Sequence, residues 1–349
     1  MREKTVNLKR LSEHLGLSQT TVSRALNGFP EVSEKTRQKV RDAADKFNYH
    51  PSPSASSLAT GKAGIIGHVV PVSEHRMINP HFSDFLAGAS DAYAKAGYDL
   101  LIRAAQEDQE ADIYRDFVSR NRVDGVVVHG PRVDETRIQL LQSIGMPFVV
   151  HGRAGGEEHS YSWLDVDNRS AIEKLTNYLI DQGHRRIALI NGLEIMNFAH
   201  RRRLGYEAAL SDHGIGIDPD LISSQDMNEP YGYEMTIAKL DMSDPPTAFI
   251  YSSVLSAMGG MRAANVRGLL PGQDISLATF DDKLSFLQAN GSGNSAPYMT
   301  SVSSSIQDAG RRVGEMLMDQ ISNPGAPPAC ELWKTDLLIG KTTGRPPTS

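Results

Sequence analysis

The sequence predicts a small all-α helix-turn-helix domain followed by a larger α/β body with doubly wound parallel sheets. Three observations carry this prediction. The chain has 349 residues, more than one ordinary domain needs. Its first fifty residues show helical periodicity interrupted by a glycine. From residue 63 onward, short apolar runs typical of strands alternate with helical stretches, as in α/β folds.

The first two helices are predicted from caps and spacing. Asn7 is a good N-cap for a helix whose apolar stripe ends at Leu15, and Gly16 suits a tight turn with positive φ. Ser18 can cap a second helix that ends at Asn27. The polar outer face of that helix lies at positions i, i+1, i+4 and i+5, which are Gln19, Thr20, Ser23 and Arg24.

A third helix follows Ser33, and its predicted inner face is Val40, Ala43, Ala44 and Phe47. Three helices joined in this way form a unit whose second helix fits the major groove of DNA. The polar side chains of that helix can match the donors and acceptors on base edges. Periodicity alone favours the alternative that this face contacts only solvent.

Charge is divided between the two parts. Residues 1–62 hold 11 Lys and Arg against 6 Asp and Glu, whereas the remainder holds 25 against 36. A basic head on an acidic body indicates that only the head approaches a polyanion, although chance clustering is the alternative.

The run from Leu17 to Gly28, followed by Val32–Arg37 and by Tyr49-His50-Pro51, resembles the DNA-binding head of LacI/GalR-family regulators. The resemblance implies that Gln19 and Thr20 read bases and that other residues contact the backbone or a base. The candidate DNA-binding residues are Asn7, Ser18, Gln19, Thr20, Ser23, Arg24, Asn27 and Leu58.

Residues 51–62 are small, polar and rich in Pro and Ser, which is typical of a flexible linker. In the resembled family this stretch is a hinge that orders on DNA. Leu58 stands where the family has a leucine that wedges into the minor groove, and it is the one large apolar side chain of the stretch. The alternative is that Leu58 packs against the body. Ser56 stands where many relatives carry arginine.

The expected strands of the body are Ile65–Val70, Asp99–Ile102, Gly125–Val128, Phe148–Val150, Ile187–Ile190, Ala248–Tyr251 and Ile275–Phe280. The expected helices between them are Phe82–Ala96, Gln109–Asn121, Asp134–Ile144, Ser170–Gln182, Arg201–His213, Tyr231–Lys239 and Ser256–Asn265. Ligands of such sheets bind at the carboxyl ends of the strands, and a cleft between two lobes is the natural site.

The family resemblance continues through Val166–Arg169, Gly183–Ala188, Arg202–Tyr206 and Asp281-Asp282. It implies a body like a periplasmic sugar-binding protein, which gives residues 1–50 as the head, 51–62 as the hinge and 63–349 as the effector-binding and dimerisation domain. The expected N-lobe is about 63–164 and 293–325, and the expected C-lobe is about 165–292 and 326–345. The expected crossovers lie near Trp163–Asp167, Gly291–Pro297 and Asn323–Pro328.

The resemblance also implies an effector pocket. Arg202 and Asp281 match the family's arginine and aspartate that bind effector hydroxyls, although a salt bridge between the lobes is an alternative role. The complete candidate set is Phe82, His129, Arg153, Arg202, Ser253 and Asp281. For His129 and His151, a structural role in the core is an equal alternative. The chain departs from the family at Ser252-Ser253 and at Gly152, and both changes remove polar groups, so the effector does not carry over from a known member.

Other classes of protein are disfavoured. The chain lacks dinucleotide, phosphate-loop and zinc-protease motifs, and the adjacent Asp281 and Asp282 point in opposite directions from a strand end, so they form no acid–base pair. A single cysteine, Cys330, allows no internal disulfide or Cys-rich metal site. No apolar run is long enough to span a membrane and no export signal is evident, which argues against a free-standing sugar-binding protein. His184-Arg185-Arg186 is expected to be a basic surface turn.

The sequence therefore predicts a cytoplasmic homodimeric transcriptional regulator that requires no cofactor and is not an enzyme. Its expected partners are pseudo-palindromic operator DNA and a small effector, a sugar or sugar derivative. Release of repression of a carbohydrate operon by that sugar is the primary hypothesis, and the sequence is weakly similar to α-glucoside-operon repressors. A corepressor-dependent or activating member of the family that responds to a non-sugar molecule is the alternative.

Overall fold

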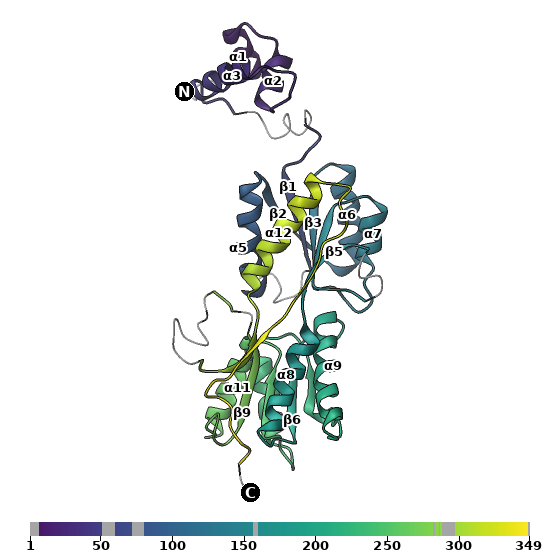
Figure 1. Ribbon diagram of the computed structural model, residues 1–349, viewed down its shortest axis with the longest axis vertical. Coiled ribbons are helices and arrows are strands. Elements are labelled where there is room, and N and C mark those ends of the chain that lie inside the picture. Colours follow the sequence, from purple (N-terminus) through teal and green to yellow (C-terminus); the bar gives the residue numbers. More distant parts are fainter. Residues whose placement is uncertain are drawn as a thin grey trace. The chain divides into compact units, whose positions relative to one another are not determined.

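Figure 1 presents the computed structural model of the chain, which describes residues 7–50, 60–71, 80–155, 160–281, 283–285, 287 and 297–347. The chain divides into two units, one of residues 1–65 with 116–124 and one of residues 66–115 with 125–349. Across the described ranges, no helix has the length and apolar character that a membrane crossing requires.

The head contains three helices: α1 (Leu8–Leu15), α2 (Gln19–Leu26) and α3 (Glu34–Lys46). Each predicted N-cap is confirmed, because the side chains of Asn7, Ser18 and Ser33 accept backbone N–H groups three residues further on. Gly16 ends α1 with φ of 65°, a left-handed conformation that favours glycine at this turn.

A compact apolar core holds the head together. Leu11, Val22, Ala25 and Val40 are fully buried, and one of these comes from α1, two from α2 and one from α3. Burying the predicted stripes of all three helices against one another fixes the angle at which α2 stands. The outer face of α2 is thereby left for another partner.

The body contains two sheets. The first has the strand order β11-β5-β4-β3-β1-β2, and every pairing recorded in it is parallel. Its strands are β1 (Ile65–Pro71), β2 (Asp99–Ala105), β3 (Gly125–His129), β4 (Phe148–His151), β5 (Ser162–Val166) and β11 (Cys330–Trp333). We call this sheet and its helices the N-lobe.

Helices cover both faces of the N-lobe sheet (Figure 1). On one face α5 (Pro80–Lys95) and α12 (Ile306–Ser322) pack together, and on the other lie α6 (Glu110–Ser119) and α7 (Arg137–Ser143), with a short 3-10 turn at Glu107–Gln109 before α6. Gly88 and Gly310 let the backbones of α5 and α12 approach each other closely, since a Cβ at either position would collide with the opposite helix.

The second sheet has the order β12-β10-β9-β8-β6-β7. It is parallel except for β12, which runs antiparallel to β10. Its strands are β6 (Ile187–Asn191), β7 (Ile222–Ser224), β8 (Ala248–Tyr251), β9 (Ser276–Asp281), β10 (Thr300–Ser303) and β12 (Asp336–Leu338). We call this sheet and its helices the C-lobe.

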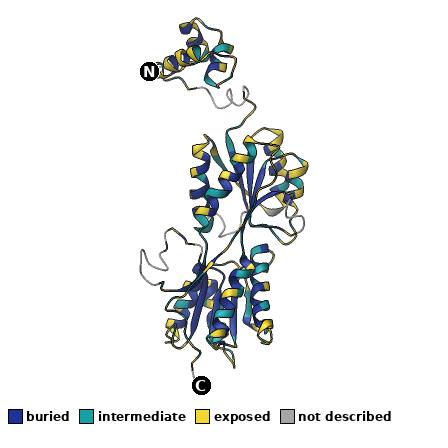
Figure 2. Cartoon of the chain, viewed as in Figure 1, coloured by how far each residue is buried: buried dark blue, intermediate teal, exposed yellow. Residues whose placement is uncertain are grey.

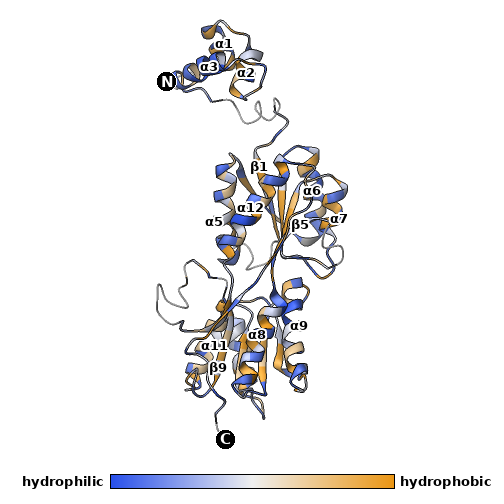
Figure 3. Ribbon diagram, in the orientation of Figure 1, coloured by the Kyte–Doolittle hydropathy of each residue, from blue (hydrophilic) through white to orange (hydrophobic). Residues whose placement is uncertain are grey.

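Two separate apolar clusters lie on the two faces of the C-lobe sheet. One cluster draws on α8 (Asn168–Asp181) and α9 (Asn197–Asp212), and the other draws on α10 (Glu229–Leu240) and α11 (Val254–Val266). A 3-10 turn at Pro219–Leu221 precedes β7. Figures 2 and 3 show the consequence, namely buried and largely apolar strands between helices whose outer faces are exposed and hydrophilic. The two doubly wound sheets are the predicted fold class of the body.

The lobe boundaries need correction. The first crossover follows β5 at Val166, where it was predicted, but β10 belongs to the C-lobe sheet and β11 to the N-lobe sheet. The second and third crossovers therefore lie at 304–305 and 334–335, not near Gly291–Pro297 and Asn323–Pro328. Residues 300–303 move from the predicted N-lobe to the C-lobe, and 330–333 move the other way. Glycine- and proline-rich stretches indicate loops, but they do not tell which sheet the next strand joins.

Two further predictions about the body were wrong. β2 was expected to be a buried strand, but most of its residues are exposed or half-buried because it is an edge of the N-lobe sheet. His184 was expected on the surface but is fully buried, where its ring contacts Thr247 and Ser276 and the carbonyl of Gly344. It thereby attaches the C-terminal segment to the C-lobe.

Candidate functional site

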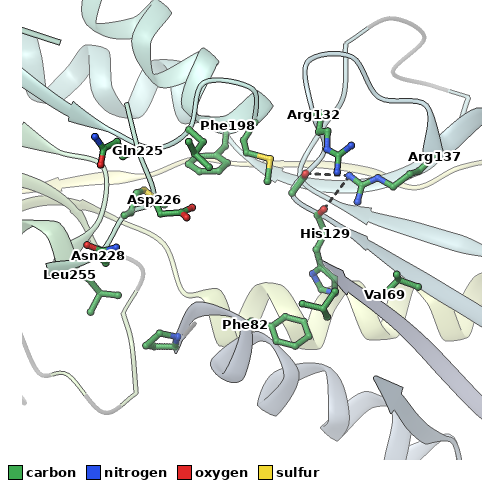
Figure 4. Close-up of a pocket in the computed structure, with 16 residues that line it drawn as sticks. Val69, Phe82, His129, Arg132, Arg137, Phe198, Gln225, Asp226, Asn228 and Leu255 are labelled. Atoms are coloured by element: carbon green, nitrogen blue, oxygen red, sulfur yellow. Dashed lines mark hydrogen bonds between the residues drawn. The ribbon is translucent and has the colours of Figure 1, made fainter. Parts of the chain in front are cut away.

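Two adjoining cavities lie between the N-lobe and the C-lobe. Their volumes are about 390 and 260 Å³. Residues at the carboxyl ends of β1, β3, β6 and β7 line the larger cavity, as expected for α/β sheets. Both cavities share the walls formed by Phe82, His129, Gly130, Phe198 and Met227. Figure 4 shows the larger cavity, with Phe82 and His129 on one side and Phe198 on the other.

The N-lobe wall is built around buried imidazoles. His129 and His151 are paired neighbours on β3 and β4, and His68 lies on β1 beside them. His68 Nδ1 lies 2.8 Å from His129 Nε2, and His68 Nε2 lies 3.1 Å from the Tyr93 hydroxyl. The ring of Phe85 packs against His151 at a centroid distance of 4.5 Å.

Burial keeps His68 and His129 neutral. It lowers the pKa of His68 to about 3. It also lowers the pKa of His129 well below its ordinary value, and the neighbouring His68, His151 and Arg137 add to that decrease. Within the described part of the chain, no group of three His, Cys, Asp or Glu residues is arranged to hold a metal ion. As neutral rings, His68 and His129 each have one N–H donor and one nitrogen acceptor, which the contacts at 2.8 and 3.1 Å engage.

A buried arginine, which the sequence analysis missed, orders the loop after β3. Arg137 forms an ion pair with Glu135 at 2.6 Å and donates to the carbonyls of His129 and Gly130. These hydrogen bonds, drawn in Figure 4, hold the end of β3 in place. Glu110 lies 3.6 Å from Arg137 and balances its charge further. The signal in the sequence was the acidic–basic pair at 135 and 137 beside a strand end.

The C-lobe wall holds a cation. Arg202 on α9 is 5% exposed, donates from Nε to Asn168 at 2.8 Å and donates from Nη1 to the Ser252 carbonyl. Its guanidinium lies 3.8 Å from the ring centroid of Phe280 and 5.0 Å from that of Phe198. Two aromatic faces and two acceptors thus stabilise a buried charge that lines the smaller cavity.

An aspartate–arginine pair faces the same cavity from the N-lobe. Arg153 Nε lies 3.6 Å from an Asp165 carboxylate oxygen, and the guanidinium covers the ring of Trp163. Burial raises the pKa of Asp165 to about 6, although Arg153 opposes that increase. Asp165 also accepts hydrogen bonds from the backbone of Val166 and from Asn168.

The predicted effector residues are only partly brought together. Phe82 and His129 line both cavities, and Arg153 and Arg202 line the smaller one. Ser253 and Asp281 line neither of the two. Ser253 caps α11 and approaches His81, which does line the smaller cavity, and Asp281 accepts from the backbone of Lys283.

Arg202 and Asp281 both belong to the C-lobe, on α9 and β9, so a salt bridge between these two residues would not join the lobes. Arg202 does act electrostatically on Asp165 of the N-lobe, whose pKa it lowers against the larger effect of burial. Several polar groups of the larger cavity were missed, namely Arg132, Gln225, Asp226 and Asn228. Three of them follow β7, a strand of three residues that is too short to recognise by alternation. The Asn228 N-cap before Pro230 was the available signal.

The candidate DNA-binding residues fall into two groups in the head. Gln19, Thr20 and Arg24 are exposed on α2 and make no recorded capping contact. The others have structural partners. Asn7 and Ser18 accept from the backbone N–H groups of α1 and α2, and the Asn27 amide donates to the carbonyl and hydroxyl of Ser23. Leu58 lies outside the described residues.

An exposed helix-turn-helix head and a two-lobed body with a ligand-sized cleft define a class of protein, the effector-controlled DNA-binding regulators. The profile described as bacterial regulatory proteins, lacI family, matches residues 12–52. The profile described as periplasmic binding proteins and sugar binding domain of LacI family matches residues 63–338. The chain therefore belongs to the LacI family and is a DNA-binding transcriptional regulator.

Individual relatives match over nearly the whole length. The chain is 41% identical over 343 residues to the HTH-type transcriptional regulator AglR of Rhizobium meliloti (strain 1021), covering 98% of this chain and 95% of that relative. It is 31% identical to the regulator RafR of Escherichia coli, covering 98% and 99%. Among solved structures, the complex of transcriptional regulator CelR with cellobiose is similar, with a TM-score of 0.70 and 26% identity over 97% of this chain and 99% of that one.

Proposed function

We propose that this chain is a cytoplasmic homodimeric repressor of carbohydrate-utilisation genes, and that a sugar bound between its two lobes releases it from DNA. The observation that carries the proposal is the pair of adjoining cavities at the strand ends of both lobes. A ligand that contacts both walls binds some lobe arrangements more tightly than others, and such differential affinity links the body to the head.

The chemistry of the walls favours a neutral sugar. Phe82 and Phe198 offer apolar faces for the C–H side of a pyranose ring, while Arg202 and Asp165 offer a charged donor and acceptor for hydroxyl groups. Two adjoining cavities that share these aromatic walls suit a sugar of two rings. Similarity to AglR and to a regulator in complex with cellobiose supports this class. We infer an α-glucoside as the effector.

The six predicted effector residues enter this proposal with different weights. Phe82, His129, Arg153 and Arg202 are proposed to contact the sugar directly because they line the cavities. Ser253 and Asp281 are proposed to act one contact away, through His81 and through the backbone of Lys283. No step in this function requires a cofactor or a covalent reaction on the ligand. We therefore propose that the protein is not an enzyme.

For the head, we propose that Gln19 and Thr20 read base edges in the major groove and that Arg24 binds a base or phosphate, since these side chains are exposed on α2. Asn7, Ser18, Ser23 and Asn27 would fix the helix ends that approach the backbone. The proposed domain limits are 1–50 for the head, 51–62 for the hinge and 63 onward for the body. A twofold dimer would read a pseudo-palindromic operator.

Leu58 is proposed to wedge into the minor groove at the operator centre. The Leu58→Ala variant should bind operator more weakly while its sugar affinity remains that of the wild type. Fluorescence anisotropy with an operator fragment and calorimetry with the sugar measure the two properties separately. Unchanged operator affinity would contradict the assignment of Leu58 as a minor-groove wedge.

The effector proposal is tested on the full chain with maltose, sucrose, trehalose and cellobiose. A sugar that binds the folded state raises its thermal stability by mass action. The same sugar should release the chain from an operator fragment selected from genomic DNA. Tighter DNA binding with the sugar would favour the corepressor-dependent alternative, and no thermal response to any sugar would contradict a sugar effector.

A further inference from the structure

The hydrogen bonds that end at His129 form a chain of three residues. Tyr93 on α5 is 1% exposed, and its hydroxyl lies 3.1 Å from His68 Nε2. His68 on β1 is fully buried, and its Nδ1 lies 2.8 Å from His129 Nε2. This series of hydrogen bonds therefore leads from the core between α5 and the N-lobe sheet to a residue that lines both cavities.

Both imidazoles are neutral, so each has one N–H donor and one bare nitrogen acceptor. Desolvation lowers the pKa of His68 to about 3 and holds that of His129 well below its ordinary value. The two hydrogen bonds can then have either of two donor directions. Either each group donates to the next one toward His129, or each group donates to the next one toward Tyr93.

The buried hydroxyl of Tyr93 selects between these directions. Of the residues that the structure describes, only His68 lies within hydrogen-bond distance of this hydroxyl. If His68 donated to Tyr93, the phenolic proton would be buried without an acceptor, which costs more than an ordinary hydrogen bond contributes. Tyr93 therefore donates to His68 Nε2, and His68 donates through Nδ1 to His129 Nε2.

The remaining nitrogen of His129 then carries a proton. His129 Nδ1 has no hydrogen-bond partner among the described residues. It is also not one of the polar side-chain atoms that are both fully buried and without a partner. It is thus accessible, and the accessible space around this side chain is the pair of cavities. Figure 4 shows the imidazole of His129 close to the ring of Phe82 at the cavity wall.

We propose that Tyr93 and His68 are positioning residues that hold His129 in one tautomer, so that His129 Nδ1–H donates to an acceptor oxygen of the effector. This inference rests on the proposed sugar site and deepens it. A hydroxyl, ring or glycosidic oxygen can accept from this N–H, whereas an ammonium group cannot. The relay of Tyr93, His68 and His129 therefore selects oxygen acceptors and rejects cationic groups at this position.

The direction of the relay can be measured without any ligand. Two-bond nitrogen–proton NMR spectra of the full chain with ¹⁵N-labelled histidine distinguish the two imidazole tautomers. His129→Gln and His68→Gln identify the signals of the two residues. We expect both residues in the Nδ1–H form, and the Nε2–H form of His129 would overturn the proposal.

Affinity measurements test the consequence for the effector. In Tyr93→Phe, the dissociation constant of the sugar should rise about five- to tenfold, which corresponds to the loss of about one hydrogen bond. In a His129→Gln background, the same change should have no further effect, because the glutamine amide donates without help from His68. Additive losses in the double variant would contradict the relay.

The matched control is Tyr206→Phe. Tyr206 is also fully buried, and its hydroxyl donates to the Ile187 carbonyl in the C-lobe core, away from both cavities. This variant should lose thermal stability but keep its sugar affinity, and an equal loss of affinity in both variants would assign the Tyr93 effect to folding. If no sugar binds the wild type, the proposed function fails, and the NMR measurement still decides the direction of the relay.

Discussion

The two lobes place different kinds of buried polar group in their cavity walls. The N-lobe wall keeps His68 and His129 neutral, since their burial disfavours the charged form. The C-lobe wall keeps the charge of Arg202, which lies between the rings of Phe198 and Phe280 and donates to Asn168. The N-lobe wall therefore offers neutral imidazoles beside the Arg153–Asp165 ion pair, whereas the C-lobe wall offers an arginine held by aromatic rings and neutral acceptors.

This difference indicates how a neutral polyol is recognised. A sugar hydroxyl can accept from either wall, but a hydrogen bond from a cation is roughly twice as strong as one from a neutral donor. We expect the C-lobe wall to supply more of the affinity and the N-lobe wall to supply more of the selectivity. Substitutions in each wall test that division.

Replacing the cationic side chain of Arg202 should change sugar affinity more than any other proposed substitution. Arg202→Met keeps the length of the side chain but removes its charge and hydrogen bonds, and sugar affinity should fall about 100-fold, as expected for hydrogen bonds to a charged group. Sugar-dependent release from the operator should disappear while operator binding persists. Calorimetry and fluorescence anisotropy measure the two properties.

The neighbouring residue provides the control for this variant. Arg203 lies on the same helix but forms ion pairs with Glu194 and Glu207 nearer the surface. Because such pairs contribute at most about 1 kcal/mol, Arg203→Met should leave sugar affinity unchanged. Induction that survives in Arg202→Met would show that the proposed pocket is misplaced.

Asp165 should make stability depend on pH. Its folded-state pKa is about 6 and its unfolded value is 3.8, so the folded state binds the proton more tightly between these values. This carboxyl therefore contributes stability at low pH that is lost as pH rises from about 4 to 6, by about 1–3 kcal/mol. The Asp165→Asn variant should lack this decrease.

Thermal melts from about pH 3 to pH 7 measure the Asp165 effect as a difference between variant and wild type. Asp308→Asn is the control, because hydrogen bonds from Ser305 and Arg311 lower the pKa of that exposed carboxyl. Its contribution is present above pH 3.8 and is lost as pH falls, so the sign is opposite. The same pH dependence in all three proteins would mean that Asp165 is not a buried acid.

The two aromatic walls should contribute comparable amounts. Phe82→Leu and Phe198→Leu each remove a ring that lines both cavities. Each change should weaken sugar binding about five- to tenfold, because ring contacts contribute about 0.5–1.5 kcal/mol beyond the buried area. If Phe198→Leu has the larger effect, its additional contact with Arg202 accounts for the difference. No change in either variant would place the sugar elsewhere.

The smallest expected effect is that of pH on sugar affinity between pH 6.5 and 8. The groups that face His129 include His68, His151 and Arg137, and all of them lower its pKa. Since His68 and His129 stay neutral in this range, the affinity should change less than about twofold. Calorimetry at several pH values measures it, and a loss of affinity near pH 7 would show that one of the two histidines becomes protonated there.

Local features were the part of the molecule that the sequence predicted well. The caps at Asn7, Ser18 and Ser33 and the alternation of strands and helices depend on neighbouring residues, and the structure has them as predicted. Long-range pairing was predicted poorly. The exchange of β10 and β11 between sheets depends on residues far apart in the chain, and no local pattern encodes it.

The candidate site shows the same limit. Arg202 was found through a family motif and Phe82 through its position in the resembled fold, but His68 looked like part of an apolar strand, Ile65–Val70. Its role appears only when β1 and β3 lie side by side, because the partner of His68 is 61 residues away. Arg137 was missed for the related reason that its acceptors are carbonyl groups, which every residue has.

In the proposed function, sugar between the lobes and DNA at the head oppose each other's binding to one protein. This coupling is tested by the operator affinity of the full chain, measured by fluorescence anisotropy with and without saturating maltose, sucrose or trehalose. We expect at least one of these sugars to weaken operator binding, and the operator to weaken binding of that sugar by the same factor. Operator affinity that is identical with and without every sugar would contradict it.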